Sequence, residues 1–364
     1  MSIKTKLRCM LTVVLLVILA MMGLTYFWGS SSLNDFLNQT GLEVVQASAE
    51  RTAEIFTKVA QIASTSAIAT RYGIERFGMD ERQLEDLTVV LRDANSQGGI
   101  VDVHFSSEAT GRISISSRWQ EPDDYDARTR SWYQKALAVP EGTVAFTQPY
   151  FDLVTKQISV SAVMAVYSSR GTLLGVLGVD IDFDILSSIV VNLKIFTQGK
   201  GALFLQNGLV VAHHNEDYVL KANFLEDGEF SESQRAFTRR MVAGETGFAN
   251  YDCQRQSHRA FFAPVGNGYY LSISFPLTVV DSIIRGFTSV LMIAATAALV
   301  LICGLALTIT RGLSRSLNGM NAVTSELGDG DLSVRFDDRR NDELGRMAKA
   351  LNGMLDSISD VFGK

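Results

Sequence analysis

The chain has 364 residues, enough for two or three domains, and its net charge of −6 gives no reason to expect a nucleic-acid partner. Hydrophobic residues make up 47% of it, a membrane-biased share, while the 20% of charged residues indicates that much of the chain lies in water. Of three cysteines, Cys9 and Cys303 lie in apolar runs and Cys253 stands alone. A disulfide framework is therefore excluded, and an extracytoplasmic domain has to rely on core packing.

Two uncharged stretches, residues 9–28 and 286–310, are each long enough to cross a bilayer as a helix. Residues 29–50 contain no Lys or Arg, whereas basic residues lie beyond the other ends of both stretches: Lys4, Lys6 and Arg8 before the first, Arg311 and Arg315 after the second. The positive-inside rule predicts a cytoplasmic N-terminus (1–8), two transmembrane helices and an outside segment at 29–285. Arg285, at the outer edge of the second stretch, is an exception to this rule.

A cleaved signal peptide is the alternative for the first stretch. Its apolar run is longer than an ordinary h-region, and no A-x-A-like cleavage site follows closely. A buried core helix is the alternative for the second stretch, but 25 uncharged residues are too many for one. Both stretches are therefore predicted to be membrane helices.

The segment between them has the pattern of a folded domain. Residues 30–70 lack proline and predict one long helix, because apolar side chains recur at helical spacing at Leu42, Val45, Ile55, Val59 and Ile62. Alternating apolar residues then predict strands at 101–105, 112–116, 157–167 and 175–182. A turn at 168–171 joins the last two into a hairpin.

A second, smaller set of strands follows. Asn207-Gly208 between the apolar runs 202–205 and 209–212 is a strong hairpin signal. Further strands are expected at 247–251, 259–262 and 270–274. The order strand–turn–strand, helix, three strands thus occurs twice. The predicted fold class is α+β: two stacked antiparallel-sheet modules, at about 75–185 and about 195–278, on a long N-terminal helix.

One run in the first module resembles a known signature. Tyr125-Asp126-Ala127-Arg128-Thr129-Arg130-Ser131-Trp132-Tyr133 is similar to the Y-D-x-R-x-R-x-W-Y motif of double Cache sensor domains. The hairpin ending Gly175-Val-Leu-Gly-Val-Asp180 resembles the same family, and the stretch from Asn207 to His213 resembles its membrane-proximal module. The resemblance covers most of residues 30–280 and implies PAS-like modules. It also matches the amino-acid-binding subgroup (dCache_1), whose distal module holds a free amino acid, at Tyr125, Arg130, Trp132, Tyr133, Tyr150 and Asp180.

The chemistry of these residues suits an amino-acid zwitterion. An Arg130 guanidinium grips a carboxylate with two hydrogen bonds, and Asp180 supplies the counter-charge for an ammonium group. Trp132, Tyr133 and Tyr150 offer aromatic faces to a cation and polar tips to the ligand. Taken singly, Trp132 and Tyr133 fit core packing as well, and Tyr150 fits a half-buried position.

Alternatives exist for both charged anchors. Asp180 also suits the end of a strand, with Asp182 or Asp184 as the partner of the ammonium group. Arg128 competes with Arg130 for the carboxylate, and the spacing to the following tryptophan favours Arg130 only through the family resemblance.

Metal binding and catalysis have little support in the sequence. His213-His214 is a possible start of a metal site, but no further Cys, His or acidic group recurs at ligand spacing, which favours a solvated strand end. Walker A and G-x-S-x-G motifs are absent. We therefore expect no enzyme activity, no metal and no cofactor.

Helical spacing resumes after the second apolar stretch. Leu313 to Leu327 and Asn341 to Ile358 predict two amphipathic helices, separated by a glycine break and an extended connector with Leu332, Val334 and Phe336. Gly328-Asp-Gly-Asp-Leu332 and Asp342-Glu343-Leu344-Gly345 resemble the connector and second-helix start of a HAMP relay, placed at 311–360. The proline common after the membrane helix in that family is Gly312 here.

Two such helices cannot bury their apolar stripes alone, which predicts a homodimer with a parallel four-helix bundle. An amphipathic tail on the membrane surface fits less well, because acids and bases are balanced in residues 337–346.

The expected function is that of a receptor in the bacterial inner membrane that binds amino acids, or related small amines and carboxylates, outside the cell. The relay would pass the signal to a downstream cytoplasmic signalling domain or a chemotaxis kinase complex. Among the possible classes of protein, a methyl-accepting chemoreceptor is the preferred prediction. The alternatives are the sensor half of a histidine kinase or diguanylate cyclase/phosphodiesterase, and a membrane-tethered solute-binding protein. Residues 311–360 argue against the last. The preferred ligand, the sign of the response, the output beyond Lys364 and binding by the proximal module stay open.

Overall fold

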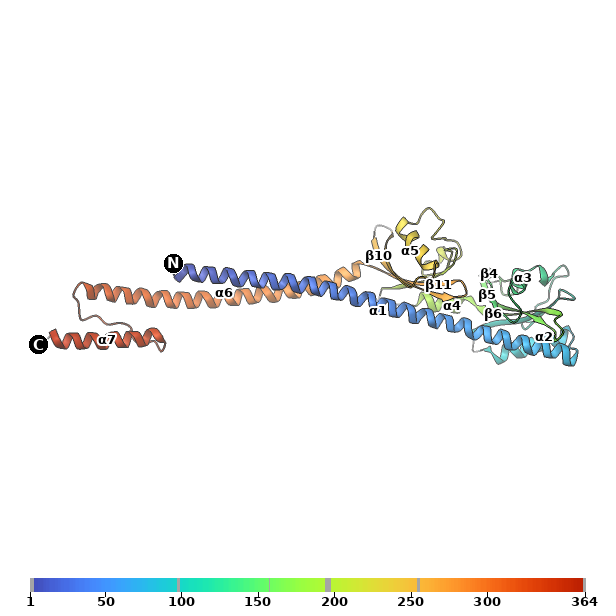
Figure 1. The fold of residues 1–364 in the computed structure, drawn as a ribbon, viewed down its shortest axis with the longest axis horizontal. Helices are drawn as coiled ribbons and strands as arrows, with labels where there is room; N and C mark the ends of the chain where they lie inside the picture. The colour runs from blue at the N-terminus through green and yellow to red at the C-terminus, as the bar shows by residue number, and fades with distance from the viewer. Residues whose placement is uncertain (1–2, 97–98, 157, 194–197, 254–255, 363–364) are drawn as a thin grey trace. The chain divides into compact units, whose positions relative to one another are not determined.

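The computed structural model describes residues 3–96, 99–156, 158–193, 198–253 and 256–362 (Figure 1). The chain divides into two compact units, residues 33–282 and residues 1–32 with 283–364. Three sequence predictions fall partly outside the described residues: the start of the N-terminal segment 1–8, Gln157 at the start of a predicted strand, and the start of the second module near residue 195.

The first helix, α1 (Ile3–Phe77), is continuous and confirms the long helix predicted over 30–70. Residues at spacings of three and four are buried along it: Leu37, Val45, Ala49, Phe56, Val59 and Ala63. Of the apolar positions predicted from the sequence, Leu42, Ile55 and Ile62 are only half-buried. Gly41 lies in the buried stripe, where a Cβ would overlap the ring of Phe261, so glycine is what allows this close approach of helix and sheet.

The distal module is built on an antiparallel sheet with strand order β2-β1-β6-β5-β3, and β4 also pairs with β5. Its strands are β1 (Ile100–Ser107), β2 (Ile113–Ile115), β3 (Ala145–Phe146), β4 (Tyr150–Phe151), β5 (Ile158–Tyr167) and β6 (Leu173–Asp182). The short helices η2 (Ala127–Thr129) and α3 (Ser131–Leu137) lie between β2 and β3. Trp132, Tyr133 and Ala136 of α3 pack against Val163 of β5 and Val176 of β6, which holds α3 on one face of the sheet.

The proximal module repeats this design. Its sheet has the order β8-β7-β11-β10-β9. The strands are β7 (Lys200–Leu205), β8 (Val210–His213), β9 (Gly247–Cys253), β10 (Gln256–Gly266) and β11 (Tyr269–Pro276). Between β8 and β9 lie η3 (Glu216–Tyr218) and α5 (Glu232–Val242), whose Phe237 and Met241 enter an aromatic-rich core. The two sheets confirm the predicted α+β fold.

Two further helices follow the second sheet. Helix α6 (Thr278–Gly328) contains the predicted stretch 286–310 and continues through Gly312 without a break. Helix α7 (Glu343–Phe362) packs Ala348 and Leu355, together with Phe336 of the connector, near the end of α6. The segments Thr12–Phe77 and Thr278–Gly328 are both long and apolar enough to cross a membrane.

The sequence did not predict two helices of the unit 33–282. Helix α2 (Glu81–Ala94) begins at a capping box formed by Asp80 and Gln83, and α4 (Phe183–Val191) begins directly after β6. Helix α4 is short and starts in a run of apolar residues that continues the preceding strand, so periodicity does not separate it from β6.

Candidate functional site

One face of the distal sheet carries polar residues in a cross-strand row. Asp102 of β1 pairs with Asp180 of β6, which pairs with Ser161 of β5. The next row places His104 opposite Gly178. Residues opposite one another in antiparallel strands project to the same face, so two carboxylates and an imidazole are gathered at one place.

A small cavity opens at this place. Its volume is about 30 Å³, and the residues around it are His104, Ile113, Ile115, Trp119, Tyr125, Arg130, Trp132, Tyr150, Asp152, Leu153, Val154 and Asp180. The structure thus brings five of the six predicted site residues together. The sixth, Tyr133, lies outside this lining: it belongs to α3, its side chain is fully buried, and its hydroxyl donates a hydrogen bond to Glu108 Oε2 at 2.6 Å.

The two candidate arginines differ in what they contact. Arg128 forms an ion pair with Asp126 at 2.8 Å and donates to the carbonyl oxygen of Glu108. Arg130, at the start of α3, lines the cavity and has no ion pair among the described residues. Of the two arginines, the one that lines the cavity is therefore the one whose guanidinium has no ion pair among the described residues.

The candidate aspartates differ in the same way. Asp180 is 2% exposed, accepts a hydrogen bond from Ser161 Oγ at 2.5 Å, and lies 3.5 Å from Tyr150 Oη. Asp182 accepts from the backbone N–H of Asp184 and caps α4, and Asp184 is exposed. Only Asp180 of the three lines the cavity.

His104 was not predicted as a site residue. Its Nε2 lies 3.5 Å from Asp180 Oδ1, its ring meets Trp132 edge to face at a centroid distance of 4.5 Å, and its Nδ1 is buried without a hydrogen-bond partner. A Cβ at Gly178 would overlap the imidazole, so glycine makes room for it.

Opposing effects act on the protonation of this imidazole. Burial disfavours the charged ring, but the negative charges of Asp180, Asp102 and Asp152 and the hydrogen bond to Asp180 raise the pKa of His104 above its usual value. Burial also raises the pKa of Asp102, although Ser116 and Ser117 donate hydrogen bonds to it.

The tyrosines at the cavity stay protonated. Burial raises the pKa of Tyr125 to about 12, and burial with the nearby charge of Asp180 raises the pKa of Tyr150 well above its usual range. Tyr150 Oη lies 2.8 Å from Ser161 Oγ, and Tyr125 meets Trp119 edge to face at 5.3 Å. The Tyr125 phenol can therefore donate a hydrogen bond to an anionic group. The Tyr150 hydroxyl donates to Ser161 Oγ, because the proton of Ser161 goes to Asp180.

Asp152, in the segment between β4 and β5, also lines the cavity. It is 5% exposed and accepts hydrogen bonds from the backbone N–H groups of Val154 and Thr155 at 2.5 and 2.9 Å. This side-chain-to-backbone turn fixes the segment that carries Leu153, which is 44% exposed. The sequence shows an aspartate two residues after Pro149-Tyr150, but it does not mark Asp152 as a site residue, because such turns are common in loops that bind no ligand.

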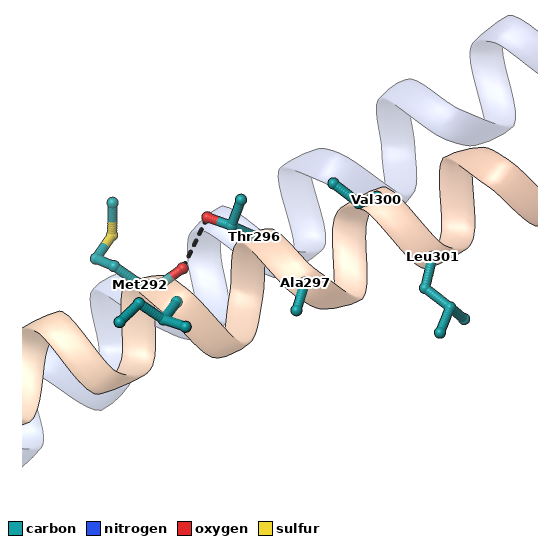
Figure 2. Close-up of a pocket in the computed structure, with 6 residues that line it drawn as sticks. Met292, Thr296, Ala297, Val300 and Leu301 are labelled. Atoms are coloured by element: carbon teal, nitrogen blue, oxygen red, sulfur yellow. Dashed lines mark hydrogen bonds between the residues drawn. The ribbon is translucent and has the colours of Figure 1, made fainter.

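Another hollow has a different character. It has a volume of about 730 Å³ along one face of α6 and is lined by Met292, Ile293, Thr296, Ala297, Val300 and Leu301. Figure 2 shows the side chains spread along a single helix, where the Thr296 hydroxyl donates to the carbonyl oxygen of Met292 at 2.8 Å. These six described residues are uncharged and lie within a candidate membrane span, so the surface suits lipid or another helix.

Metal ligands do not cluster in the part of the chain that the structure describes. Those residues contain no group of three or more His, Cys, Asp or Glu side chains placed to hold an ion. His213 and His214 stack at 4.1 Å, and burial, His214 and Lys200 lower the pKa of His213 to about 4.

The fold and the distal cavity define a class of protein: a two-module sensor domain between two helices that are each able to cross a membrane. The sequence profile of the Cache domain (dCache_1) matches residues 30–282, and that of the HAMP domain matches residues 308–360. The chain belongs to the Cache domain family.

Curated relatives are chemotaxis receptors. The methyl-accepting chemotaxis protein McpG of Pseudomonas putida is 25% identical over 260 residues, which cover 70% of this chain and 39% of that protein. PctB of Pseudomonas aeruginosa is 25% identical over 245 residues, which cover 66% of this chain and 37% of PctB. The chain thus spans about two fifths of the length of these relatives.

Solved structures share the fold of the sensor unit. The ligand-binding domain of the Pseudomonas fluorescens chemoreceptor CtaA, in complex with L-serine, matches with a TM-score of 0.54 and 20% identity over 68% of this chain and 98% of that domain. The corresponding domain of PctB from Pseudomonas aeruginosa PAO1, in complex with L-Arg, matches with a TM-score of 0.53 and 20% identity. The match covers 68% of this chain and 96% of that domain. These structures consist almost entirely of the matched region, so units of this extent fold without their membrane helices.

Proposed function

We propose that the chain is the sensory part of a membrane chemoreceptor whose distal module binds free L-amino acids. The observation that carries the proposal is the pairing, in one cavity, of an uncommitted guanidinium at Arg130 with a buried carboxylate at Asp180. A zwitterion needs one anchor of each sign, and it neutralises both when it binds, which offsets the cost of their desolvation.

Other residues that line the cavity contact either the carboxylate end or the ammonium end of the ligand. Tyr125 and the indole of Trp132 support a carboxylate held by Arg130, and Tyr150 and Ser161 accompany Asp180 at the ammonium end. Trp119 and the apolar side chains of the lining face the ligand's side chain. Tyr133 then acts by fixing α3 through Glu108 rather than by touching the ligand.

The cavity of about 30 Å³ has room for water but not for an amino acid, so a bound ligand requires displacement of part of the wall. The segment around Leu153 is the part of the wall that we propose moves. Its side chain is 44% exposed and it is held mainly by the turn at Asp152.

The relatives support the proposal. McpG and PctB are named as methyl-accepting chemotaxis proteins, and the matched domains of CtaA and PctB were solved with L-serine and L-Arg. The protein would act as a receptor rather than an enzyme.

The membrane topology is part of the proposal. With spans at 9–28 and 286–310, residues 1–8 and the relay at 311–360 lie in the cytoplasm, and the sensor at 29–285 lies outside the inner membrane. The exposed apolar side chains of the second span support it, for instance Leu301, which is 71% exposed.

The relay segment supports a homodimer. In a single chain α7 turns Ala348 and Leu355 toward α6, while Met347 and Met354, seven residues apart, are 45% and 52% exposed. These methionines belong to a heptad stripe whose other members are Leu344, Leu351 and Ile358. A second copy in a four-helix bundle would cover this stripe.

A signal has a short physical route from the cavity to the helix. The backbone N–H of Ser161 donates to Thr147 Oγ1 at 2.9 Å, and Tyr269 of the proximal sheet donates to the carbonyl oxygen of Thr147 at 3.3 Å. Phe56 of α1 contacts both Tyr269 and Phe146, with ring centroids 4.9 and 5.0 Å apart. Ligand binding at Asp180 would shift this junction, with a coupling free energy of about 1–3 kcal/mol.

A thermal-unfolding screen of the unit 33–282 against the proteinogenic L-amino acids tests the proposal. Ligand at about 100 times its Kd stabilises the folded state by about 2.7 kcal/mol, which raises Tm measurably. We expect Arg130→Ala to remove the rise and Arg128→Ala to keep it, because the Arg128 guanidinium is paired with Asp126. No rise with any amino acid would contradict the proposal.

A further inference from the structure

The proximal module has a cavity of its own. Its volume is about 520 Å³, within the range of small-molecule sites, and it lies on the face of the second sheet that α5 covers. Lys200, at the start of β7, pairs across the sheet with Ser274 near the end of β11, and both line the cavity.

The place corresponds to the distal site, but the charges differ. In the distal sheet the first strand and its neighbour supply Asp102 and Asp180, which favour a cation. In the proximal sheet the equivalent strands supply Lys200 and Ser274. Lys200 brings an ammonium group, and the described residues around the cavity include no Asp or Glu.

Hydrogen-bond donors accompany Lys200. The Nδ1 of His213 accepts from the backbone N–H of Asn215 at 3.0 Å, so the neutral ring carries its proton on Nε2 as a donor. Burial keeps the ring neutral, because it lowers the pKa of His213 to about 4. Gln234 is 4% exposed and uses its Oε1 for the backbone N–H of Ser231, which leaves its amide N–H groups for a ligand.

The other walls of the cavity are aromatic. Phe204 and Phe224 meet edge to face with centroids 5.1 Å apart, and Phe237 packs against Tyr251 at 5.0 Å. These rings line the same cavity as Lys200 and His213. Flat apolar walls of this kind accept a planar ring.

We propose that the proximal cavity is a second ligand site, and that it takes small carboxylates with an apolar, preferably aromatic, ring. The carboxylate lies between Lys200, His213 and the amide of Gln234, and the ring lies against the phenylalanines. A receptor built in this way reads two chemically different solutes, a zwitterion in the distal module and an organic anion in the proximal one. The second site does not depend on what the first one binds.

The histidines of the chain provide a readout for each site. There are four: His104 lines the distal cavity, and His213, His214 and His258 line the proximal one. In the unit 33–282 labelled with ¹³C-histidine, we expect benzoate to shift the imidazole resonances of the proximal three and leave that of His104 in place. The expected order of affinity is benzoate above benzyl alcohol and acetate, with benzylamine weakest.

Matched variants make the test specific. Lys200→Gln should weaken benzoate binding about tenfold or more in calorimetry of the full chain in nanodiscs, through loss of a charge-assisted hydrogen bond. Lys221→Gln, an exposed lysine of the same module outside the cavity lining, and Arg130→Ala should leave it unchanged. The proposal is overturned if benzoate shifts only His104 or no histidine, if benzylamine binds as tightly, or if Lys200→Gln binds normally.

Discussion

Replacing Asp180 by Asn separates a ligand-binding role of this carboxylate from a structural one. Asparagine has the same shape and keeps an oxygen to accept the hydrogen bond from Ser161, so packing is preserved. The change also removes one of two buried carboxylates that face each other across β1 and β6, because Asp102 is its cross-strand neighbour. At a pH where His104 is neutral, the unfolding free energy should therefore change by no more than about 1 kcal/mol.

Ligand affinity should respond much more strongly. A charge-assisted hydrogen bond to an ammonium group contributes about 1.5–3 kcal/mol, so Asp180→Asn should raise the Kd for an amino acid roughly 10- to 150-fold. Calorimetric titration measures the Kd, and thermal unfolding followed by circular dichroism measures stability.

Asp182→Asn is the matched control on the same strand. Asp182 caps α4 through the backbone N–H of Asp184, a role that Asn performs equally well, so both affinity and stability should stay unchanged. Normal affinity in Asp180→Asn, or an equal loss in Asp182→Asn, would refute the assignment of the ammonium anchor.

Three further predictions concern stability, pH and assembly. Phe56→Ala should lower the unfolding free energy of the unit 33–282 by about 3–5 kcal/mol. The control Phe36→Ala removes a ring that is 61% exposed on the same helix and should change the unfolding free energy by less than about 0.5 kcal/mol. Equal losses in denaturant titrations would contradict the packing of Phe56 against Phe146 and Tyr269. Because the pKa of His104 is raised, its imidazolium stabilises the unliganded fold below its unfolded pKa of 6.5, and this contribution is lost as pH rises through the folded pKa. An ammonium ligand competes with the imidazolium for Asp180, so the affinity for the ligand should rise from about pH 6 to about pH 8. A flat pH profile of affinity, or the same slope in His104→Gln, would contradict this competition. Met354→Lys should abolish cross-linking between relay helices of two chains without altering amino-acid binding, and persistent cross-linking would exclude the heptad stripe as the dimer contact.

The fold was largely predictable from the sequence because its periodicities are long and regular. The helix over 30–70, the hairpin of β5 and β6, and the Asn207-Gly208 turn each repeat one pattern over many residues or use a turn with a single preferred chemistry. Helix α2 was missed although its start carries the capping-box residues Asp80 and Gln83, and α4 was missed because it merges with the apolar run of β6.

The charged residues that we propose as anchors were predicted only with the help of a resemblance. Periodicity does not distinguish Arg130 from Arg128, or Asp180 from Asp182; the structure separates each pair by what the side chains contact. His104 lay within a predicted strand, where alternation shows which residues share a face but not that a glycine on the next strand opens space for an imidazole.

We propose that the distal cavity recognises both charges of an amino acid. A calorimetric titration of the unit 33–282 tests this with three matched compounds: the L-amino acid that gives the largest thermal shift, the amine that lacks its carboxylate, and the carboxylic acid that lacks its amino group. If Arg130 and Asp180 hold the two ends, the amino acid binds at least about tenfold more tightly than either analogue, because each analogue leaves one buried charge unpaired. Equal affinity for the amine or for the acid would show that one charge suffices and would contradict the account.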